Sequence, residues 1–212
     1  MKTILSAILV LLVLPVFSQI KDTKAIALLD EVSAKTKACK SIKADFTYSM
    51  ENKQAKINES KSGSLLLSGD KYRLKAAEQE VICDGKTIWT FLKESNEVQI
   101  NDLDNKDESL TPSKLLSNYN TNYKSKLLKD RFSDDPMDQS IELIPNIVKN
   151  FTKAILVVDK VKKQVKSFIL YDKSGNTFTY RITRYQTDVP VSQADFTFDK
   201  SKFPGVEIND MR

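Results

Sequence analysis

Residues 44–51 read Ala-Asp-Phe-Thr-Tyr-Ser-Met-Glu, a strict alternation of apolar and polar side chains that decides the class of fold. Successive side chains of a β-strand point to opposite faces of a sheet, so a period of two indicates a half-buried strand. We therefore predict a strand here, with Phe46, Tyr48 and Met50 on its apolar face.

The segment before this strand has a different period. Asp22 stands where a helix N-cap would, and Ile26, Leu29 and Val32 follow it at steps of three and four residues. This spacing places apolar side chains along one side of a helix. It predicts an amphipathic helix from about Thr23 to Cys39.

Strand-like alternation continues through most of the remaining chain, broken by turn signals such as Asp84-Gly85. The further strands that we predict are Ile57–Leu67, Lys71–Ala77, Glu80–Cys83, Thr87–Leu92, Glu97–Asn101, Tyr123–Phe132, Ser140–Ile144, Lys153–Asp159, Val165–Asp172, Thr177–Tyr185 and Phe196–Phe198. Their short connections leave no room for parallel crossovers. We therefore predict a mainly β (α+β) protein, in which one antiparallel sheet curves strongly into an unclosed or half-open barrel.

One segment interrupts this pattern with a second helix signal. Thr111 is a suitable N-cap and Pro112 suits the first helical position. The short amphipathic helix that they begin would carry Leu115, Leu116 and Tyr119.

Residues 1–18 have the features of a secretory signal peptide: the basic Lys2, an apolar run, Pro15 and a small residue, Ser18, at the expected cleavage site. The run is shorter than the roughly 20 apolar residues that a membrane span needs. We expect cleavage after Ser18, which leaves residues 19–212 as a single exported domain. The residue directly after the expected cleavage site is Gln19 and not the Cys that a lipid anchor would need, since the nearest Cys is Cys39.

Charge and composition exclude several classes of function. The chain has 33 basic and 28 acidic residues and lacks the aromatic and basic interleaving of single-strand binders, so we expect no nucleic-acid partner. Two lysine clusters could touch anionic lipid headgroups or an acidic partner, or could simply be solvated edges. The clusters are Lys35, Lys37, Lys40, Lys43 and Lys160, Lys162, Lys163, Lys166.

The chain contains no His, which removes the commonest general base and any Ser-His-Asp arrangement. The paired carboxylates Asp134 and Asp135 lie in a predicted surface loop, a solvated position that does not favour acid/base catalysis. A metal site is disfavoured because His is absent and the Cys residues do not cluster. We therefore expect a protein that is not an enzyme and needs no metal or other cofactor.

Two cysteines, Cys39 and Cys83, would meet an oxidising compartment after export. One disulfide between them is possible. A pair of small buried hydrophobic residues is the equally good alternative, since a separation of 44 positions says nothing about their geometry.

The predicted strands carry more large apolar side chains than two short helices need to cover. This surplus predicts either an ordinary packed core or a lined cavity, and periodicity does not distinguish the two. The candidate cavity residues are Phe46, Tyr48, Met50, Leu65, Leu67, Tyr72, Leu74, Trp89 and Phe91, with Leu115 and Leu116 from the second helix.

Several short motifs, in order, resemble the LolA family of periplasmic outer-membrane lipoprotein carriers. They are Ala44-Asp45-Phe46-Thr47, Gly63-Ser64-Leu65, Cys83-Asp84-Gly85-Lys86-Thr87-Ile88-Trp89, Ala194-Asp195-Phe196-Thr197-Phe198, Pro204-Gly205-Val206 and Asp210. The resemblance covers nearly all of residues 19–212. Its most specific part is the Asp-Gly-Lys-Thr-Ile-Trp turn combined with the Phe-Thr-Phe and Pro-Gly-Val ending.

The resemblance implies an unclosed antiparallel barrel with a helical lid and an apolar interior that shields acyl chains. It implies acylated lipoproteins as cargo, taken from an inner-membrane transporter of the ATP-binding-cassette type to an outer-membrane acceptor whose identity is open. By position, Tyr72, Trp89 and Phe91 match the family's cavity strands, and Leu115 and Leu116 fall in the lid. Family members often have Arg-Pro where this chain has Ser68-Gly69-Asp70, so an arginine that latches the lid is absent at the matching turn.

Two other functions remain open at the level of sequence. Related half-barrels also act as sensors, which allows a binding module for a free lipid or glycolipid, and a filled core would instead make a structural envelope protein. We expect a monomer, since a shuttle has no evident need for a stable dimer.

Overall fold

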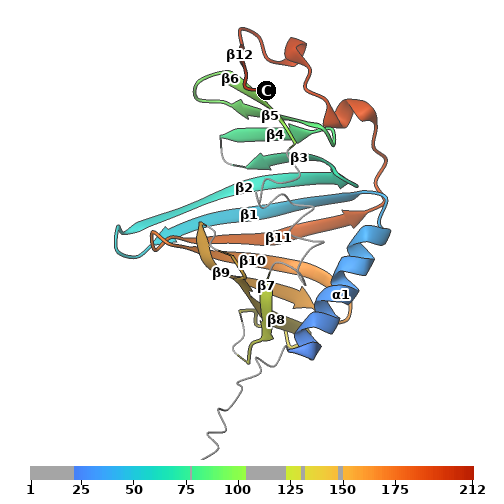
Figure 1. Ribbon diagram of the computed structural model, residues 1–212, viewed down its shortest axis with the longest axis vertical. Helices are drawn as coiled ribbons and strands as arrows, with labels where there is room; N and C mark the ends of the chain where they lie inside the picture. The colour runs from blue at the N-terminus through green and yellow to red at the C-terminus, as the bar shows by residue number, and fades with distance from the viewer. Residues whose placement is uncertain (1–21, 77, 104–122, 130–131, 148–149) are drawn as a thin grey trace, which may run out of the picture.

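The computed structural model describes residues 22–76, 78–103, 123–129, 132–147 and 150–212 (Figure 1). One helix, α1 (Thr23–Ala38), precedes the strands. The strands are β1 (Ile42–Asn52), β2 (Ile57–Ser68), β3 (Lys71–Ala76), β4 (Gln79–Cys83), β5 (Thr87–Leu92), β6 (Glu97–Asp102), β7 (Tyr123–Leu127), β8 (Asp138–Pro145), β9 (Phe151–Asp159), β10 (Gln164–Asp172), β11 (Thr177–Thr187) and β12 (Glu207–Asp210). The short 3₁₀ helices η1 (Gln193–Phe196) and η2 (Lys200–Lys202) lie between β11 and β12.

The described strands form one open sheet of twelve strands, in the order β12-β6-β5-β4-β3-β2-β1-β11-β10-β9-β8-β7. Neighbours pair antiparallel throughout, except that β12 pairs parallel with β6. The order of the strands in the sheet departs from their order in the sequence, because β11 returns from the end of the chain to pair with β1. The predicted mainly β fold, a strongly curved and unclosed antiparallel sheet with a short helix, is confirmed.

Helix α1 begins where its sequence pattern indicates. The Asp22 carboxylate accepts hydrogen bonds from the backbone N–H groups of Lys24 (3.2 Å) and Ala25 (3.1 Å), which satisfies two donors at the helix start. Its second oxygen accepts from the N–H of Leu127 (2.8 Å) on β7. One side chain therefore both starts the helix and fixes it to the sheet.

Two expectations for the strands need correction, and one strand was missed. Phe196–Phe198 is not a strand: Phe196 ends η1, which is stabilised because the Asp195 carboxylate accepts from the N–H of Ser192 (2.7 Å). The strand expected over Tyr123–Phe132 ends at Leu127. Strand β12 was not predicted, because four exposed residues have no apolar alternation to reveal it.

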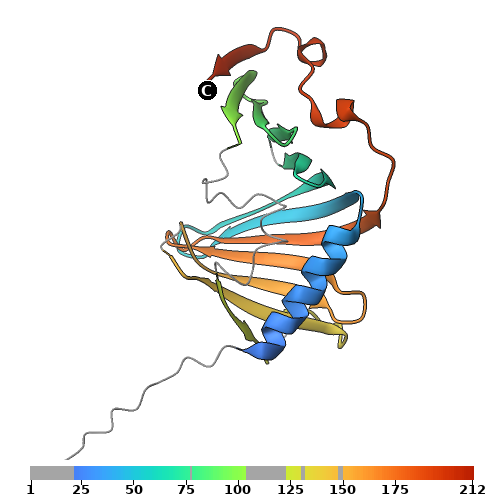
Figure 2. The ribbon, with the colours of Figure 1, turned by 45° about the vertical axis from the view of Figure 1, so that its right-hand side comes forward.

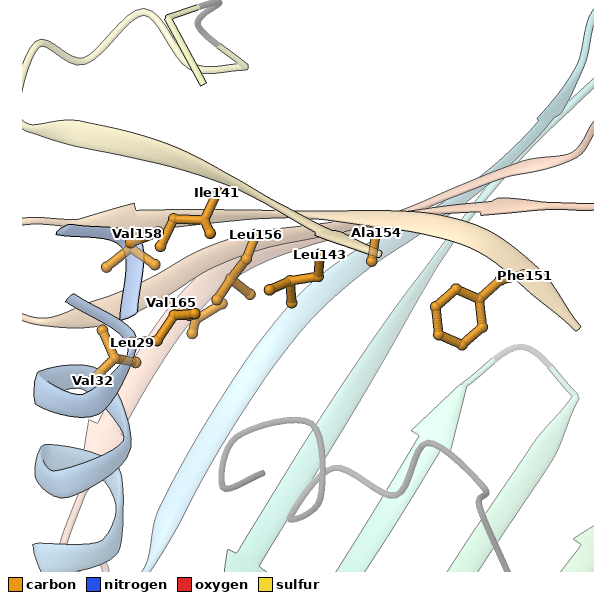
Figure 3. Close-up of a cluster of buried hydrophobic side chains, with 10 residues drawn as sticks. Leu29, Val32, Ile141, Leu143, Phe151, Ala154, Leu156, Val158 and Val165 are labelled. Atoms are coloured by element: carbon orange, nitrogen blue, oxygen red, sulfur yellow. The ribbon is translucent and has the colours of Figure 1, made fainter. Parts of the chain in front are cut away.

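Helix α1 lies on one face of the β7–β10 part of the sheet (Figures 1 and 2), and its apolar side chains pack there. The cluster beneath it contains Leu29, Val32, Ile141, Leu143, Leu156 and Val158, all at most 2% exposed (Figure 3). Burial of such side chains stabilises a fold by about 1.5–3 kcal/mol each. The helix expected from Thr111 lies outside the described residues, and within them no helix is long and apolar enough to span a bilayer.

Candidate functional site

The face of the sheet that carries α1 is concave. Strand register places Leu156, Phe168, Tyr180, Tyr48 and Lys61 in one row across β9, β10, β11, β1 and β2, all on the side of the helix. One hollow on this side is lined from β11 (Tyr180) to β5 (Leu92). A single hollow can span strands so far apart in the sheet only if the sheet bends toward it.

Seven of the predicted site residues lie on this concave face. Pairing continues across the strands from Ile42 through Leu67 and Tyr72 to Cys83. The seven are Phe46, Tyr48, Met50, Leu65, Leu67, Tyr72 and Leu74, of which Phe46, Leu67 and Tyr72 are buried and the other four half-buried. Burial raises the pKa of Tyr72 to about 12, so its hydroxyl stays neutral.

Five aromatic side chains meet at the centre of this face. Ring centroids are 5.1 Å apart for Tyr48 and Tyr180, 5.9 Å for Phe46 and Tyr180, 6.2 Å for Tyr48 and Phe178, and 6.3 Å for Phe168 and Tyr180. Tilted and offset rings at these distances attract one another beyond their area of contact. Phe168, Phe178 and Tyr180 were not among the predicted site residues, although both strands that carry them were predicted.

The ring of Phe46 lies directly over a glycine. A Cβ atom at Gly63 would come within 2.5 Å of the Phe46 Cε2 and Cζ atoms and within 2.7 Å of the Lys75 carbonyl oxygen. The absence of a side chain at residue 63 therefore lets the aromatic group lie close to the backbone of β2 and β3.

Beside the aromatic group lies a hollow of about 540 Å³. Its apolar wall contains Tyr48, Tyr180, Ala76 and Leu92, and its polar residues are Lys61, Glu78, Gln79, Lys93, Glu94 and Ser95. The Glu78 carboxylate lies 3.8 Å from the ammonium groups of both Lys61 and Lys93. The hollow thus combines an aromatic wall with a rim that carries charges of both signs.

The two tyrosines of the hollow are held neutral. Burial raises the pKa of Tyr180 to about 12, with a further contribution from neighbouring Tyr48, whose own pKa is also raised by burial. Among the described residues, neither hydroxyl has a hydrogen-bond partner. Each can therefore donate to an acceptor on a bound molecule.

Trp89 and Phe91 were expected in the same apolar surface, and this placement is wrong. Register pairs Cys83 with Ile88, so the next residue, Trp89, points to the opposite, convex face. There the C-terminal segment (residues 188–212) packs against both rings, which remain half-buried. The ring centroid of Phe203 lies 4.6 Å from that of Phe91 and 4.9 Å from that of Phe198. These rings form a cluster with Val98, Ile100 and Val206.

The C-terminal segment is held on the convex face by polar contacts as well. The Arg73 guanidinium donates to the carbonyl oxygen of Asp195 (3.1 Å), and Lys71 donates to Gln193 (2.6 Å). Sequence alternation identifies the two faces of β5 but does not say which is concave, and for that reason Trp89 and Phe91 were assigned to the wrong side.

Leu115 and Leu116 lie outside the described residues. Cys39 and Cys83 are both free thiols. Cys83 is fully buried beside Ile42, Leu67 and Tyr72, and half-buried Cys39 packs against the same cluster, so the pair behaves as small hydrophobic residues. Burial raises the pKa of both thiols and keeps them protonated.

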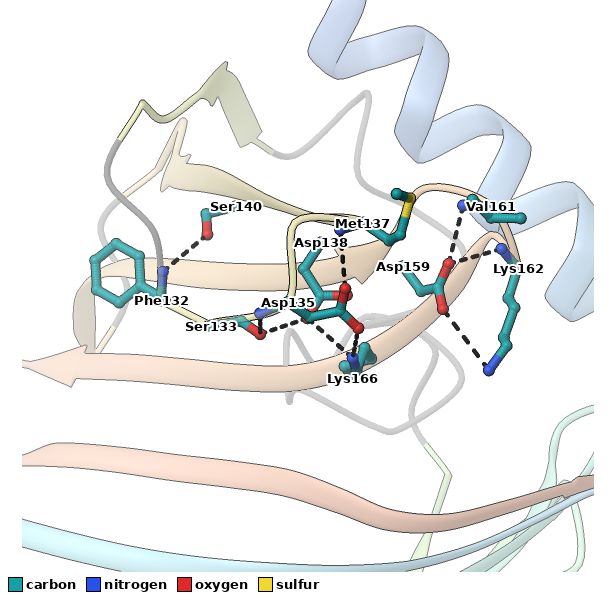
Figure 4. A network of polar contacts seen from close by, with 10 residues as sticks. All are labelled: Phe132, Ser133, Asp135, Met137, Asp138, Ser140, Asp159, Val161, Lys162 and Lys166. Carbon is teal, nitrogen blue, oxygen red and sulfur yellow. Dashed lines mark hydrogen bonds and ion pairs between the residues drawn. The ribbon is translucent and has the colours of Figure 1, made fainter.

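The acidic loop that contains Asp134 and Asp135 has a structural role. Asp135 and Asp138 both lie 3.0 Å from the Lys166 ammonium, which holds the loop on β10 (Figure 4). The Met137 N–H and Lys166 lower the pKa of Asp135, so its charge is retained. Within the described ranges, no three His, Cys, Asp or Glu residues lie close enough to hold a metal ion.

Three solved structures resemble this chain, and the first of them supports the fold. An uncharacterized conserved protein from Thermus thermophilus has a TM-score of 0.57 at 11% identity, over 88% of this chain and 99% of that chain. An outer membrane lipoprotein-sorting protein domain from Vibrio parahaemolyticus has a TM-score of 0.48 at 13% identity, over 82% and 97%. The lipoprotein LppX of Mycobacterium tuberculosis has a TM-score of 0.47 at 11% identity, over 81% and 98%.

At such low identities these likenesses concern the fold alone. No curated protein matches the chain. The family model described as outer membrane lipoprotein carrier protein LolA matches residues 37–199, which include β1 to β11 and η1. The match covers more than half of the chain and agrees with the resemblance read from its motifs, so this protein belongs to the LolA family.

Proposed function

We propose that this protein binds the acyl chains of lipoproteins on its concave face and carries them through the periplasm from the inner to the outer membrane. The single observation that carries the proposal is the aromatic group of Phe46, Tyr48, Phe168, Phe178 and Tyr180, which borders a hollow and of which all but the buried Phe46 are partly exposed. Membership of a family named for a lipoprotein carrier gives the proposal its direction.

The energetic need for such a surface is large. Each buried methylene contributes about 0.8 kcal/mol, so two or three long acyl chains exposed to water would cost roughly tens of kcal/mol. A hollow of about 540 Å³ is in the size range of small-molecule pockets, and the rings of Phe46 and Phe168 lie next to Tyr180 in its wall. Partial cover by flexible apolar contacts also allows release, which a sealed core would not.

Three further parts of the proposal come from the family and from the sequence. Residues 1–18 act as the signal peptide, an inner-membrane transporter of the ATP-binding-cassette type supplies the cargo, and an outer-membrane acceptor receives it. No catalytic step is assigned, and residues 19–212 form the working domain as a monomer.

Binding of a synthetic triacylated lipopeptide tests the proposal. Tyr180→Glu places a carboxylate among the concave aromatic side chains, and we expect it to weaken binding at least tenfold, because a charge would be desolvated by the acyl chains. The control is Thr179→Glu, which adds the same charge on the same strand but on the convex face, and should change binding less than about twofold. Circular dichroism checks that both variants fold. Equal affinity of wild type and Tyr180→Glu would refute the proposal.

A lipid- or glycolipid-binding module is the second candidate, and the charged rim of the hollow favours it. Lys61, Glu78, Lys93 and Glu94 could bind a polar headgroup while the tail lies on the aromatic wall. Mass spectrometry of material that co-purifies with the protein distinguishes the two: an acylated polypeptide supports the carrier, and a free lipid or glycolipid alone supports the module. A structural protein with a filled core would retain neither.

A further inference from the structure

The fold brings together two lysine clusters that are far apart in the sequence. The hairpin between β9 and β10 (residues 160–163) lies beside α1 (Figures 1 and 2), and two contacts join it to the C-terminal half of the helix. The Lys35 ammonium donates a hydrogen bond to the Lys162 carbonyl oxygen at 2.6 Å, and Lys163 forms an ion pair with Glu31. We call residues 31–40 and 159–163, with the adjacent Met137, the basic corner.

The basic corner carries a surplus of positive charge. The carboxylates of Asp30 and Asp188 border it, and Asp188 accepts from the Lys40 N–H (2.8 Å). Residues 31–40 and 159–163 themselves contain six lysines and two carboxylates, those of Glu31 and Asp159. Both carboxylates are engaged: Glu31 pairs with Lys163, and Asp159 accepts from the N–H groups of Val161 (2.9 Å) and Lys162 (2.8 Å). The negative end of the α1 dipole explains lysines in the last turn of the helix, but it does not explain those of the hairpin.

Most of these ammonium groups face solvent. Among described residues, the side chains of Lys37 and Lys160 make no ion pair or hydrogen bond, and that of Lys162 is 73% exposed and 3.9 Å from Asp159. Flexible ammonium groups in this condition can move to meet an anionic surface at little cost.

Two exposed apolar side chains lie among the lysines. Val161, at the tip of the hairpin, is 70% exposed, and Met137 is 50% exposed. Met137 is next to the hairpin because its carbonyl oxygen accepts from the Lys160 N–H (2.9 Å). The Asp159 hydrogen bonds and the Lys166 ion pairs hold the hairpin and the loop of Met137 in place (Figure 4).

We propose that the basic corner docks on the surface of an anionic phospholipid bilayer. Each lysine near such a surface contributes attraction that falls off within a Debye length, and small apolar side chains between the lysines can enter the headgroup region. A protein partner would need a packed pocket or an aromatic anchor at the centre of its interface, and the basic corner has neither among the residues that define it. The inference is independent of what the concave face binds, because α1 and the hairpin tip lie apart from the aromatic group.

Vesicle flotation with the full mature chain tests this docking. Vesicles of phosphatidylcholine with about one third phosphatidylglycerol should bind the protein at low salt, and pure phosphatidylcholine vesicles should not. Lys160→Gln/Lys162→Gln should weaken binding on the order of tenfold. The matched control is Lys53→Gln/Lys173→Gln, which removes the same charge from two exposed residues in hairpins at the other end of the strands, and should change binding less than about twofold.

Val161→Ser provides a second arm that leaves the charge unchanged. We expect it to lower binding to the anionic vesicles about threefold relative to wild type. The effect should be clearest at high salt, where the charges of the lysines are screened. The proposal is overturned if the wild type does not bind anionic vesicles, or if the two double lysine substitutions weaken vesicle binding equally. It is also overturned if Lys160→Gln/Lys162→Gln weakens binding to an acidic protein but leaves vesicle binding unchanged. Lipopeptide affinity, measured on the same variants, should remain that of the wild type.

Discussion

Leu156 and Leu92 both point to the concave face of one sheet, but Leu156 is 2% exposed beneath α1, whereas Leu92 is half-buried and lines a hollow. Much of the β7–β10 half of this face is covered by a helix that begins at Asp22 and is fixed to β7, although Phe168 on β10 stays half-buried. The half formed by β1 to β5 with β11 carries aromatic side chains that are only partly covered. Similar side chains thus serve as core in one half and as available surface in the other, depending on what lies above them.

The convex face offers a second contrast. Trp89 and Phe91 are large aromatic residues like Tyr48 and Tyr180, yet the C-terminal segment packs against them with Phe198 and Phe203. Among the described residues, α1 covers part of one face and the C-terminal segment covers part of the other. The aromatic group that we assign to the ligand lies away from the C-terminal segment and borders the α1 cluster, which Phe168 contacts.

The sharpest test of the first comparison is the same substitution in both halves. Leu156→Ala should lower the free energy of unfolding by about 3 kcal/mol, because it leaves a cavity under α1. Leu92→Ala should cost only about 1 kcal/mol, since water already reaches that side chain. Urea unfolding followed by circular dichroism measures both. Equal losses would mean that the two halves are equally packed.

A substitution in the C-terminal segment tests the second comparison, between the aromatic residues of the convex and concave faces. Phe203→Ala should cost about 2 kcal/mol of stability, through lost packing with Phe91 and Phe198. It should also shift the emission of Trp89, the only tryptophan, to longer wavelength, while leaving lipopeptide binding unchanged. Phe178→Ala should do the reverse, weakening binding without moving the emission. If Phe203→Ala weakens lipopeptide binding, Trp89 and Phe91 belong to the ligand-binding site after all.

The smallest effect concerns the attachment of α1. Backbone N–H groups of Leu127, Ala25 and Lys24 lower the pKa of Asp22 below its ordinary 3.8. A lowered folded-state pKa stabilises the protein above the unfolded value, and this stabilisation is lost as pH falls through the folded value. Asp22→Ala should therefore cost about 1 kcal/mol at pH 7 and less near pH 3.

The exposed carboxylate of Asp134 serves as the control for this pH dependence. Asp134→Ala should change stability little at either pH, because none of the hydrogen bonds of the described residues uses this side chain. If the cost of Asp22→Ala is the same at pH 3 and pH 7, ionisation of Asp22 does not contribute to holding the helix.

Much of the fold was predictable from local periodicity. The helix expected over Thr23–Cys39 is observed over Thr23–Ala38, and the strand Thr87–Leu92 has the predicted bounds. These segments have strong apolar periods and clear turn or cap residues at their ends. β12 and η1 were not predictable in the same way, because their conformation depends on pairing with β6 and on contacts with β3.

The candidate site was only half predictable. Alternation correctly put Phe46, Tyr48 and Met50 on one face, and Leu65, Leu67, Tyr72 and Leu74 share that face. Phe178 and Tyr180 were missed because nothing in the sequence says that β11 pairs with β1, from which it is separated by more than a hundred residues. Register between distant strands is set by the packing of the whole sheet.

By itself, the sequence determined the periods of helix and strand, the turns between them and the lack of His chemistry, since these depend on composition and on neighbours a few positions apart. Only the tertiary structure decided which face of each strand is concave, which aromatic side chains are covered by α1 or by the C-terminal segment, and that two lysine clusters meet at one corner. The physical reason is that a period of two defines two equivalent faces, and only the curvature and long-range pairing of the sheet make those faces different.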